Sequence, residues 1–314
     1  MSILVSGSIA CDTVLEHEGS IGRRLANGDM CHLNATFLAP HMRVTLGGCA
    51  TNIAFTLRHL GAYPLPWGVV GEDGDAFLTE FAAHGISTQG ITKLSGCLTA
   101  RCVIFTDVDG AQLSAFHPGA LARGQEAPWP QISGKEVTPS LAILSPAGRE
   151  ATLRAAQECT RRKIPYLFDV GQELPLFSKK ELLELLNRAF GIALSDFEAQ
   201  EFTRITGLTP AQMACAQKFV LVTHGADGAS FWRPKQTEAQ FVEALRVDGI
   251  AVGAGDAMRA GLLFGLERGL EYLEAVRLGA VSAATWVRRK GGPLTLTLDS
   301  AREDYASQWG PSPF

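Results

Sequence analysis

The sequence of 314 residues lacks any run of 18 apolar residues and any excess of positive charge. The first absence argues against a membrane-spanning helix. The second absence is shown by the formal net charge of -4 at pH 7, which argues against binding to nucleic acid or to an anionic membrane. No basic segment followed by a long apolar one opens the chain, so we expect a soluble protein that is not exported.

Cysteine and histidine are present but lack the spacing of ligand sets. The seven cysteines are scattered and never form Cys-x-x-Cys. This odd and dispersed set argues against a disulfide framework or a zinc site, and a reducing cytoplasm fits it best. The seven histidines show no ligand spacing with other metal-binding residues. We therefore expect no structural metal.

Several common nucleotide-binding motifs are also missing. The chain has no Gly-x-x-x-x-Gly-Lys-Ser/Thr segment and no His-Arg-Asp set of a protein kinase. Its first strand-like segment continues into Gly7-Ser8-Ile9-Ala10 rather than into Gly-x-Gly-x-x-Gly. A Rossmann oxidoreductase is therefore disfavoured.

What the sequence does contain is a regular alternation of strand and helix patterns. Hydrophobic residues make up 46% and charged residues 19%, as in globular proteins. Strands are predicted over 3–9, 67–70, 141–144, 166–169, 192–194 and 219–223, and helices over 50–60, 75–84, 149–162, 178–189, 196–206 and from 257 onward. Such alternation predicts a mainly parallel central sheet with helices on both faces.

Two further segments are predicted to form strands outside the main sheet. The first covers 30–46, and the second is a hairpin of strands 99–106 and 111–116. In parallel sheets, ligands bind beyond the carboxyl ends of the strands. Four polar residues are expected at those ends: Asp12, Asp169, Ser195 and Thr223.

The segment Gly253-Ala254-Gly255-Asp256 is the most informative motif of the chain. The apolar spacing that follows it predicts a helix. Glycines allow backbone N–H groups to converge on an anion, and a helix N-terminus adds unpaired donors. Asp256 supplies a base, although an N-capping aspartate after a plain turn would give the same residues. In outline this is a phosphoryl-transfer site.

Two other glycine-rich segments accompany it. Gly47-Gly48 opens a predicted helix, and Asn52 lies one turn into that helix, where its amide can both donate and accept hydrogen bonds. Close packing between a helix and the sheet would also explain these glycines. Thr223-His224-Gly225-Ala226-Asp227-Gly228 follows a predicted strand and, paired with the Gly253 loop, offers a place for a nucleotide.

These three segments together resemble the signatures of the ribokinase-like (PfkB) family of carbohydrate and nucleoside kinases. Gly47, Gly48 and Asn52 match Gly-Gly-x-x-x-Asn, residues 253–256 match Gly-Ala-Gly-Asp, and the nucleotide turn lies between them. The resemblance covers nearly the whole chain. It implies one ribokinase-like domain over 1–314: a three-layer α/β/α sandwich with a mainly parallel central sheet and a small β-sheet lid from about 12–46 and 97–118.

Within the family, the segments around Asp12 and around 99–120 are most similar to those of bacterial adenosine kinases. The implied reaction is transfer of the ATP γ-phosphoryl group to the 5′-hydroxyl of adenosine, which yields AMP. Asp256 would accept the hydroxyl proton, and the N–H groups of 253–255 would form an anion hole. The implied partners are small molecules only, with a homodimer through the lid as a further possibility.

The resemblance also implies the binding residues. The substrate would contact Asp12, Gly47, Gly48, Asn52, Phe116, Cys102 and Gln172, and ATP would contact Ser195, Thr223, Gly225, Gly228 and Gly253. Mg²⁺ would be held through water by Glu198, although Glu198 would also favour a helix N-terminus through the dipole. Arg259, one turn after Asp256, is a candidate phosphate contact.

Departures from the family pattern keep other acceptors open. Ser195 replaces the Asn of an Asn-x-x-Glu motif, Ile250-Ala251-Val252 replaces polar residues before the Gly253 loop, and Cys102 replaces an aromatic residue. One alternative is a family kinase that acts on a sugar or another nucleoside. Another is a non-catalytic nucleoside or sugar sensor, against which the retained Asp256 argues.

Overall fold

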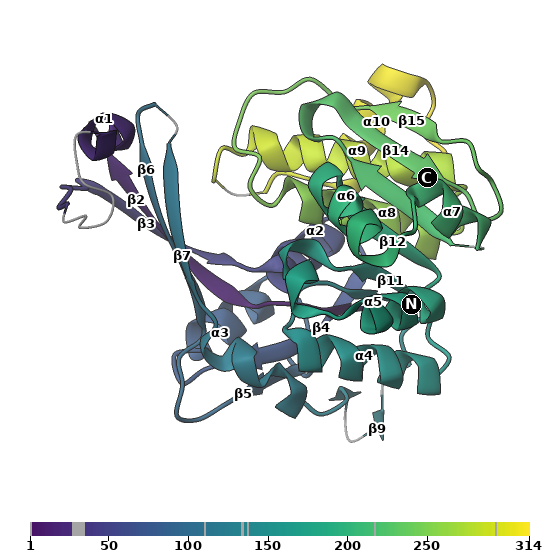
Figure 1. Ribbon diagram of the computed structural model, residues 1–314, viewed down its shortest axis with the longest axis horizontal. Coiled ribbons are helices and arrows are strands. Elements are labelled where there is room, and N and C mark those ends of the chain that lie inside the picture. The colour runs from purple at the N-terminus through teal and green to yellow at the C-terminus, as the bar shows by residue number, and fades with distance from the viewer. Residues whose placement is uncertain are drawn as a thin grey trace.

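The computed structural model describes residues 2–26, 35–109, 111–132, 135–136, 138–216, 218–292 and 294–314. Its larger sheet has nine strands in the order β15-β14-β13-β12-β11-β10-β1-β4-β5 (Figure 1). All pairs from β13 to β5 are parallel, and antiparallel pairing begins at β14. The bounds are β1 Ser2–Ser6, β4 Tyr63–Val70, β5 Ile91–Lys93, β10 Leu141–Leu144, β11 Tyr166–Asp169, β12 Gly191–Ser195, β13 Phe219–Thr223, β14 Gly228–Trp232 and β15 Gln240–Glu243.

Helices cover both faces of this sheet. One face packs against α2 Cys49–His59, α3 Asp75–Ala83, α8 Ala254–Glu267, α9 Tyr272–Arg288 and α10 Leu298–Trp309. The other packs against α4 Arg149–Arg161, α5 Lys179–Arg188, α6 Asp196–Thr206 and α7 Pro210–Cys215. Successive strand residues enter opposite cores, as Leu167 and Phe168 of β11 do. The predicted three-layer α/β/α arrangement is confirmed.

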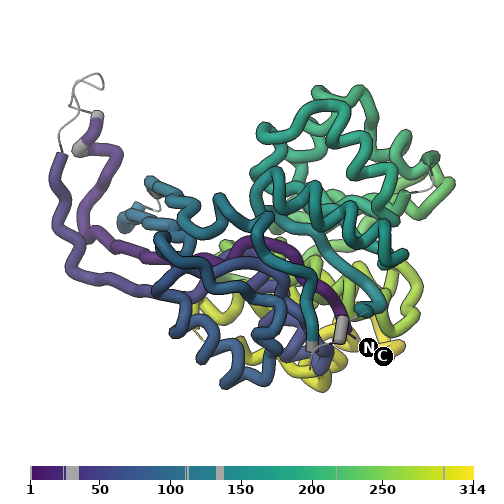
Figure 2. Tube along the Cα trace, turned by 90° about the horizontal axis from the view of Figure 1, so that it is seen from below, coloured from purple at the N-terminus to yellow at the C-terminus, as the bar shows by residue number. Residues whose placement is uncertain are grey.

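A second sheet of four strands, which we call the lid, has the order β3-β2-β6-β7. Its strands are β2 Ala10–His17, β3 His41–Gly47, β6 Ala100–Asp107 and β7 Gln112–His117. β6 and β7 form the predicted antiparallel hairpin, whereas β2 and β6 pair in parallel. Figure 1 shows the lid projecting from the side of the nine-stranded sheet, with α1 Ile21–Ala26 near its outer end, and Figure 2 shows the same projection in a perpendicular view.

One prediction about the first strand is wrong. β1 ends at Ser6, and the chain then leaves the nine-stranded sheet, so Asp12 lies within β2 of the lid. The reason is pairing: Ala10 is already in register with Gly47 of β3 and Ala100 of β6. Part of the predicted strand segment 30–46 lies outside the described residues.

Short elements complete the connections. These are β8 Gln131–Ile132, β9 Lys135–Glu136 and the 3₁₀ helices η2 Gly119–Glu126, η3 Gly171–Leu176 and η4 Gly225–Asp227. Within the described ranges, none of the helices combines the length and the apolar character that crossing a membrane requires.

Candidate active site

The loop before α8 is held in one conformation by its own backbone and by a tryptophan. Gly253 caps the helix with φ 85° and ψ -3°, a left-handed conformation that favours glycine. A Cβ on Gly253 would lie only 2.7 Å from Nε1 of Trp286, so the residue must also be small. The same Nε1 donates a hydrogen bond of 2.8 Å to the Val252 carbonyl. These contacts with Trp286 support the conformation of the loop.

The anion hole is predicted at the N-terminus of α8. Asp256 lies in the first turn of the helix. The N–H of Ala254 donates to the Ala251 carbonyl at 2.9 Å, and the helix geometry leaves the N–H groups of the next two residues without an intrahelical acceptor. The role of the Ala254 N–H in an anion hole stays a prediction, because this N–H would first have to give up its hydrogen bond to the Ala251 carbonyl.

The two glycine motifs meet at Asp256. Nδ2 of Asn52, on α2, donates a hydrogen bond of 2.8 Å to Oδ2 of Asp256, on α8. Gly48 precedes α2 with φ 90°, and a Cβ there would lie 2.4 Å from the Ser8 carbonyl oxygen. The glycine therefore lets α2 begin against the segment that joins β1 to β2. This placement brings Asn52 to α8 across 204 positions of sequence.

Desolvation sets the charge state of Asp256. Burial raises the pKa of Asp256 to about 6, and the hydrogen bond from Asn52 opposes this rise. The thiol of Cys49 also lies against the carboxylate. Burial, followed by the nearby charge of Asp256, raises the pKa of Cys49 well above its usual range. Asp256 therefore has the properties of a base that titrates close to neutral pH, beside a neutral thiol.

The lid places three predicted substrate residues in one row. Asp12 of β2 is in register with Cys102 of β6, and Cys102 with Phe116 of β7. Directly opposed residues share a sheet face, so these side chains line the same side of the lid. Phe116 is 49% exposed, and burial raises the pKa of Asp12. A Cβ on Gly47 would lie 2.1 Å from the Asp12 carboxylate, so Asp12 occupies the space that this glycine leaves open.

Polar residues end three neighbouring parallel strands, as predicted. Asp169, Ser195 and Thr223 are the last residues of β11, β12 and β13. Ser195 and Thr223 are in direct register. Gly225 and Gly228 follow Thr223 at the two ends of η4. Four of the five predicted ATP residues thus lie at the carboxyl edge of the sheet, next to the start of α6, and the fifth, Gly253, caps α8.

The side chain of Arg259 lies in the protein interior, where it pairs with Asp169. Its Nε lies 2.8 Å from Oδ1 of Asp169, and the two side chains are 7% and 2% exposed. Oδ2 of Asp169 accepts a hydrogen bond of 2.8 Å from the Ser145 hydroxyl. Nη2 of Arg259 also lies 3.9 Å from Oε2 of Glu198. The candidate role of Arg259 as a phosphate contact is therefore replaced by a buried ion pair, which the sequence did not predict.

Glu198 caps its own helix. Its Oε2 accepts a 2.7 Å hydrogen bond from the Ser195 N–H, and its own N–H donates to the Ser195 hydroxyl at 3.4 Å. Over the described ranges, no three His, Cys, Asp or Glu side chains form a metal-binding group. A water-mediated Mg²⁺ is compatible with this donor set, because Mg²⁺ usually keeps several waters and binds one or two carboxylates plus phosphates.

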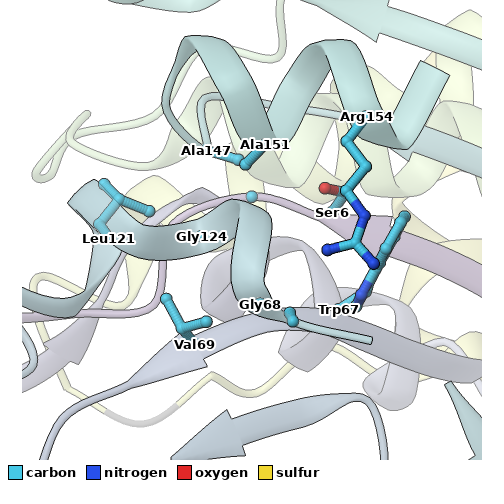
Figure 3. A pocket seen from close by; sticks show the side chains of 11 residues that line it. Ser6, Trp67, Gly68, Val69, Leu121, Gly124, Ala147, Ala151 and Arg154 are labelled. Carbon is cyan, nitrogen blue, oxygen red and sulfur yellow. The ribbon is translucent and has the colours of Figure 1, made fainter. Parts of the chain in front are cut away.

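Two remaining features lie around the site. Gln172 is exposed in η3, directly after the turn that follows Asp169. A cavity of about 10 Å³ lies between η2 and the carboxyl ends of β1 and β4, beside Trp67 and Arg154 (Figure 3). It has room for one water at most. Gln172 as a substrate contact stays a prediction.

Known proteins are similar to this chain in sequence and in fold. The pfkB family carbohydrate kinase model matches residues 25–297. The nucleoside kinase of Methanocaldococcus jannaschii is 25% identical over 82% of this chain and 84% of its own. The structure of the Burkholderia thailandensis nucleoside kinase in complex with inosine is 31% identical, with a TM-score of 0.87 over 99% of this chain and 100% of its own. The structure of the same enzyme in complex with ADP-inosine has 32% sequence identity and a TM-score of 0.84, and the match covers 99% of this chain and 97% of that chain.

Proposed function

Because this chain belongs to the pfkB family of carbohydrate kinases and is thus a phosphotransferase with a hydroxyl acceptor, we propose that its acceptor is a nucleoside. The observation that carries the proposal is the contact of Asn52 with Asp256, together with a lid face that bears Asp12 and Phe116 and joins α2 through Gly47 and Gly48. An acidic base, a hydroxyl-binding amide and an aromatic ring are the groups that a ribose with a planar base requires.

In the proposed reaction, Asp256 accepts the proton of the primary hydroxyl as that oxygen attacks the γ-phosphorus of ATP. The bond from phosphorus to the β-bridging oxygen breaks, and ADP leaves. Asn52 orients the carboxylate through its 2.8 Å hydrogen bond. The Gly253 loop and the N-terminus of α8 stabilise negative charge on the transferring group.

The lid row would hold the nucleoside. Asp12 would bind ribose hydroxyls as an acceptor, with Gly47, Gly48 and Asn52 beside it, and Phe116 would stack on the base. A purine suits this row because its larger π-face gains more from stacking. Adenosine, with AMP as the product, is the acceptor that the sequence predicts. Inosine is the second candidate, because a relative with 31% identity was solved with inosine bound.

ATP would lie along the carboxyl edge of the sheet. Ser195, Thr223, Gly225 and Gly228 would contact the nucleotide, and the triphosphate would run toward Gly253. The complex of a relative with ADP-inosine supports a nucleotide next to the nucleoside. Glu198 would hold Mg²⁺ through water, and that ion would neutralise part of the triphosphate charge.

The alternatives from the sequence are weaker on this geometry. A sugar acceptor would use Asp12 and Asn52 but would leave the exposed Phe116 ring without a partner. A sensor needs no base, whereas Asp256 is oriented by Asn52 and has a pKa of about 6.

An ATP-consumption assay with Mg²⁺ over adenosine, inosine, guanosine, cytidine, ribose and fructose tests the proposal. Turnover on a purine nucleoside with little on ribose or fructose is expected. Turnover on a sugar alone would refute the nucleoside acceptor. Ligand-dependent stabilisation without turnover on any compound would favour the sensor.

We also infer a homodimer through the lid and a cytoplasmic location. The face of the lid opposite Asp12 bears four exposed apolar side chains, which we call the outer patch: Met42, Val44, Val103 and Leu113. An exposed apolar sheet face of this kind is typical of an interface. The cysteines are dispersed, and the six that the structure describes are all free, which suits a reducing compartment.

A further inference from the structure

Two arginines from distant parts of the chain approach each other where the lid meets the core. Arg43 lies on β3 and is in register with Val14, two positions along β2 from Asp12. Residues two apart share a sheet face, so Arg43 lies on the substrate face of the lid. Arg289 follows the last residue of α9 and stacks on Trp286, with its guanidinium carbon 3.8 Å from the ring centroid.

The two guanidinium groups lie near the end of α9, and Trp286 connects this region to the Gly253 loop. Trp286 touches that loop directly, because its Nε1 donates to the Val252 carbonyl and its ring fills the space beside Gly253. Arg43 reaches the same region from the lid. A Cβ on Gly291, two residues beyond Arg289, would lie 2.6 Å from Nη1 of Arg43. Gly291 has φ 81°, so glycine suits the position twice over.

Neither guanidinium has an anionic partner among the residues that the structure describes. The Nε of each is buried without a hydrogen-bond acceptor there. Nη1 of Arg289 donates to the Gly292 carbonyl at 3.1 Å, which neutralises no charge. Burial, and after it the proximity of Arg43, lowers the pKa of Arg289. Two like charges are thus brought together in a partly buried place, at a cost in free energy.

Packing alone explains one arginine but not the pair. Arg289 gains from the ring of Trp286 and from the carbonyl end of α9. Arg43 has no such compensation and would be less costly as a neutral residue. An anion between the two groups would reverse the sign of the interaction and add charge-assisted hydrogen bonds.

We propose that Arg43 and Arg289 form a binding site for a phosphate group between the lid and the core, beside the Gly253 loop. The proposal rests on the kinase function above for its ligands, since phosphate groups belong to the nucleotide and to the phosphorylated product. Free inorganic phosphate has the same chemistry. A phosphate held from both sides would also draw the lid toward α9.

Isothermal titration of the full chain with ADP, AMP, inorganic phosphate and adenosine tests the site in the wild type, Arg43→Met and Arg289→Met. The matched control is Arg288→Met, since Arg288 neighbours Arg289 but pairs with Asp304. We expect Arg43→Met and Arg289→Met to bind at least one phosphate-bearing probe about tenfold more weakly, with adenosine affinity within about twofold of the wild type. Thermal unfolding of the ligand-free Arg43→Met variant should show equal or higher stability, because a repulsion is removed.

The probe that is weakened identifies the source of the phosphate. A loss for ADP assigns the site to the nucleotide, a loss for AMP to the phosphorylated acceptor, and a loss for inorganic phosphate alone to a free anion. The proposal is overturned if no phosphate-bearing probe is weakened beyond the Arg288→Met control, or if adenosine is weakened as much as the others. Absence of nucleoside turnover would refute the kinase function, while the phosphate titrations would still decide this site.

Discussion

At the scale of single residues, the contact between Asn52 and Asp256 controls both the position and the charge of the proposed base. The hydrogen bond favours the carboxylate form, whereas burial favours the neutral acid, and the resulting pKa is about 6. Activity should therefore be full above about pH 7 and fall as the pH drops through 6. At neutral pH the Asp256 carboxylate is then mostly deprotonated and can accept the proton of the hydroxyl group.

Replacing Asn52 by Leu should move this acidic limb. Without the amide donor, the carboxylate loses its opposing stabilisation, so the pKa of Asp256 rises and the limb of kcat/KM shifts to higher pH by about one unit. A pH profile of nucleoside phosphorylation measures the shift. A lower rate with an unmoved limb would mean that Asn52 only binds substrate and does not tune Asp256.

Cys102 should limit the affinity for a purine. It lies between Asp12 and Phe116 in the lid row, where an aromatic ring would add a second stacking surface. Cys102→Phe should lower the Kd of adenosine about three- to tenfold, as expected for one aromatic contact. Val103→Phe, on the opposite lid face, is the control. Equal effects of the two changes, or none from Cys102→Phe, would count against the assigned pocket.

The sequence predicts which residues of the site matter better than it predicts how they touch. Asp256, Asn52 and the glycines are visible as motifs because their spacing is local. The contact between Asn52 and Asp256 and the ion pair of Arg259 with Asp169 are not visible, because each joins segments that only the folded sheet brings together. From the sequence alone, Arg259 is therefore only a candidate phosphate contact.

At the scale of elements, a buried ion pair links α8, which carries the proposed base, to the sheet. Arg259 of α8 and Asp169 at the end of β11 are 7% and 2% exposed, and Ser145 at the end of β10 supports the carboxylate. The desolvation cost of burying two charges is large, and their mutual attraction offsets it only while both charges are present. It fixes α8, and with it Asp256, relative to the carboxyl edge of the sheet.

Removing one partner should therefore be costly. Arg259→Met leaves Asp169 buried and unpaired, and we expect a loss of about 3–5 kcal/mol in the free energy of unfolding, measured with urea. The double variant Arg259→Met with Asp169→Asn should recover part of that loss. If the single variant were as stable as the wild type, the ion pair would not anchor α8.

Hydrophobic periodicity predicts the positions of several core elements, but not those of α9 and α10, whose side chains also lie in the core. The helix predicted over 196–206 is α6 itself, and the strand over 166–169 is β11. The first strand was extended too far because the pattern continues while the chain changes sheets. The sequence does not predict the parallel pairing of β2 with β6 either. The end of β2 at His17 and the start of β6 at Ala100 are separated by 82 residues, and their register depends on tertiary contacts.

At the scale of the whole molecule, the lid has two faces with different tasks. The face with Asp12 turns toward the core, as the contact of Arg43 with Gly291 indicates. The outer patch faces away from it, and Met42 and Val44 are 67% and 55% exposed. The exposed apolar side chains of the outer patch suit contact with a second copy of the chain better than contact with solvent.

The outer patch makes the homodimer testable. Val103→Lys with Leu113→Lys places like charges on the patch of both copies, and light scattering should show the dimer replaced by monomer. Leu176→Lys, a change at an exposed residue of η3 that is not part of the lid, serves as the control. A wild type that is monomeric at the same concentration would contradict the proposal.

The proposed reaction depends most directly on one group, Asp256. The decisive measurement is the rate of ATP-dependent phosphorylation of a purine nucleoside by the wild type and by Asp256→Asn, with the Kd of the nucleoside measured for both. The account predicts that the variant binds the nucleoside nearly unchanged and loses about 100- to 10,000-fold in rate, as removal of a general base should cause. A variant that retains most of its rate would contradict the assignment of Asp256 as the base.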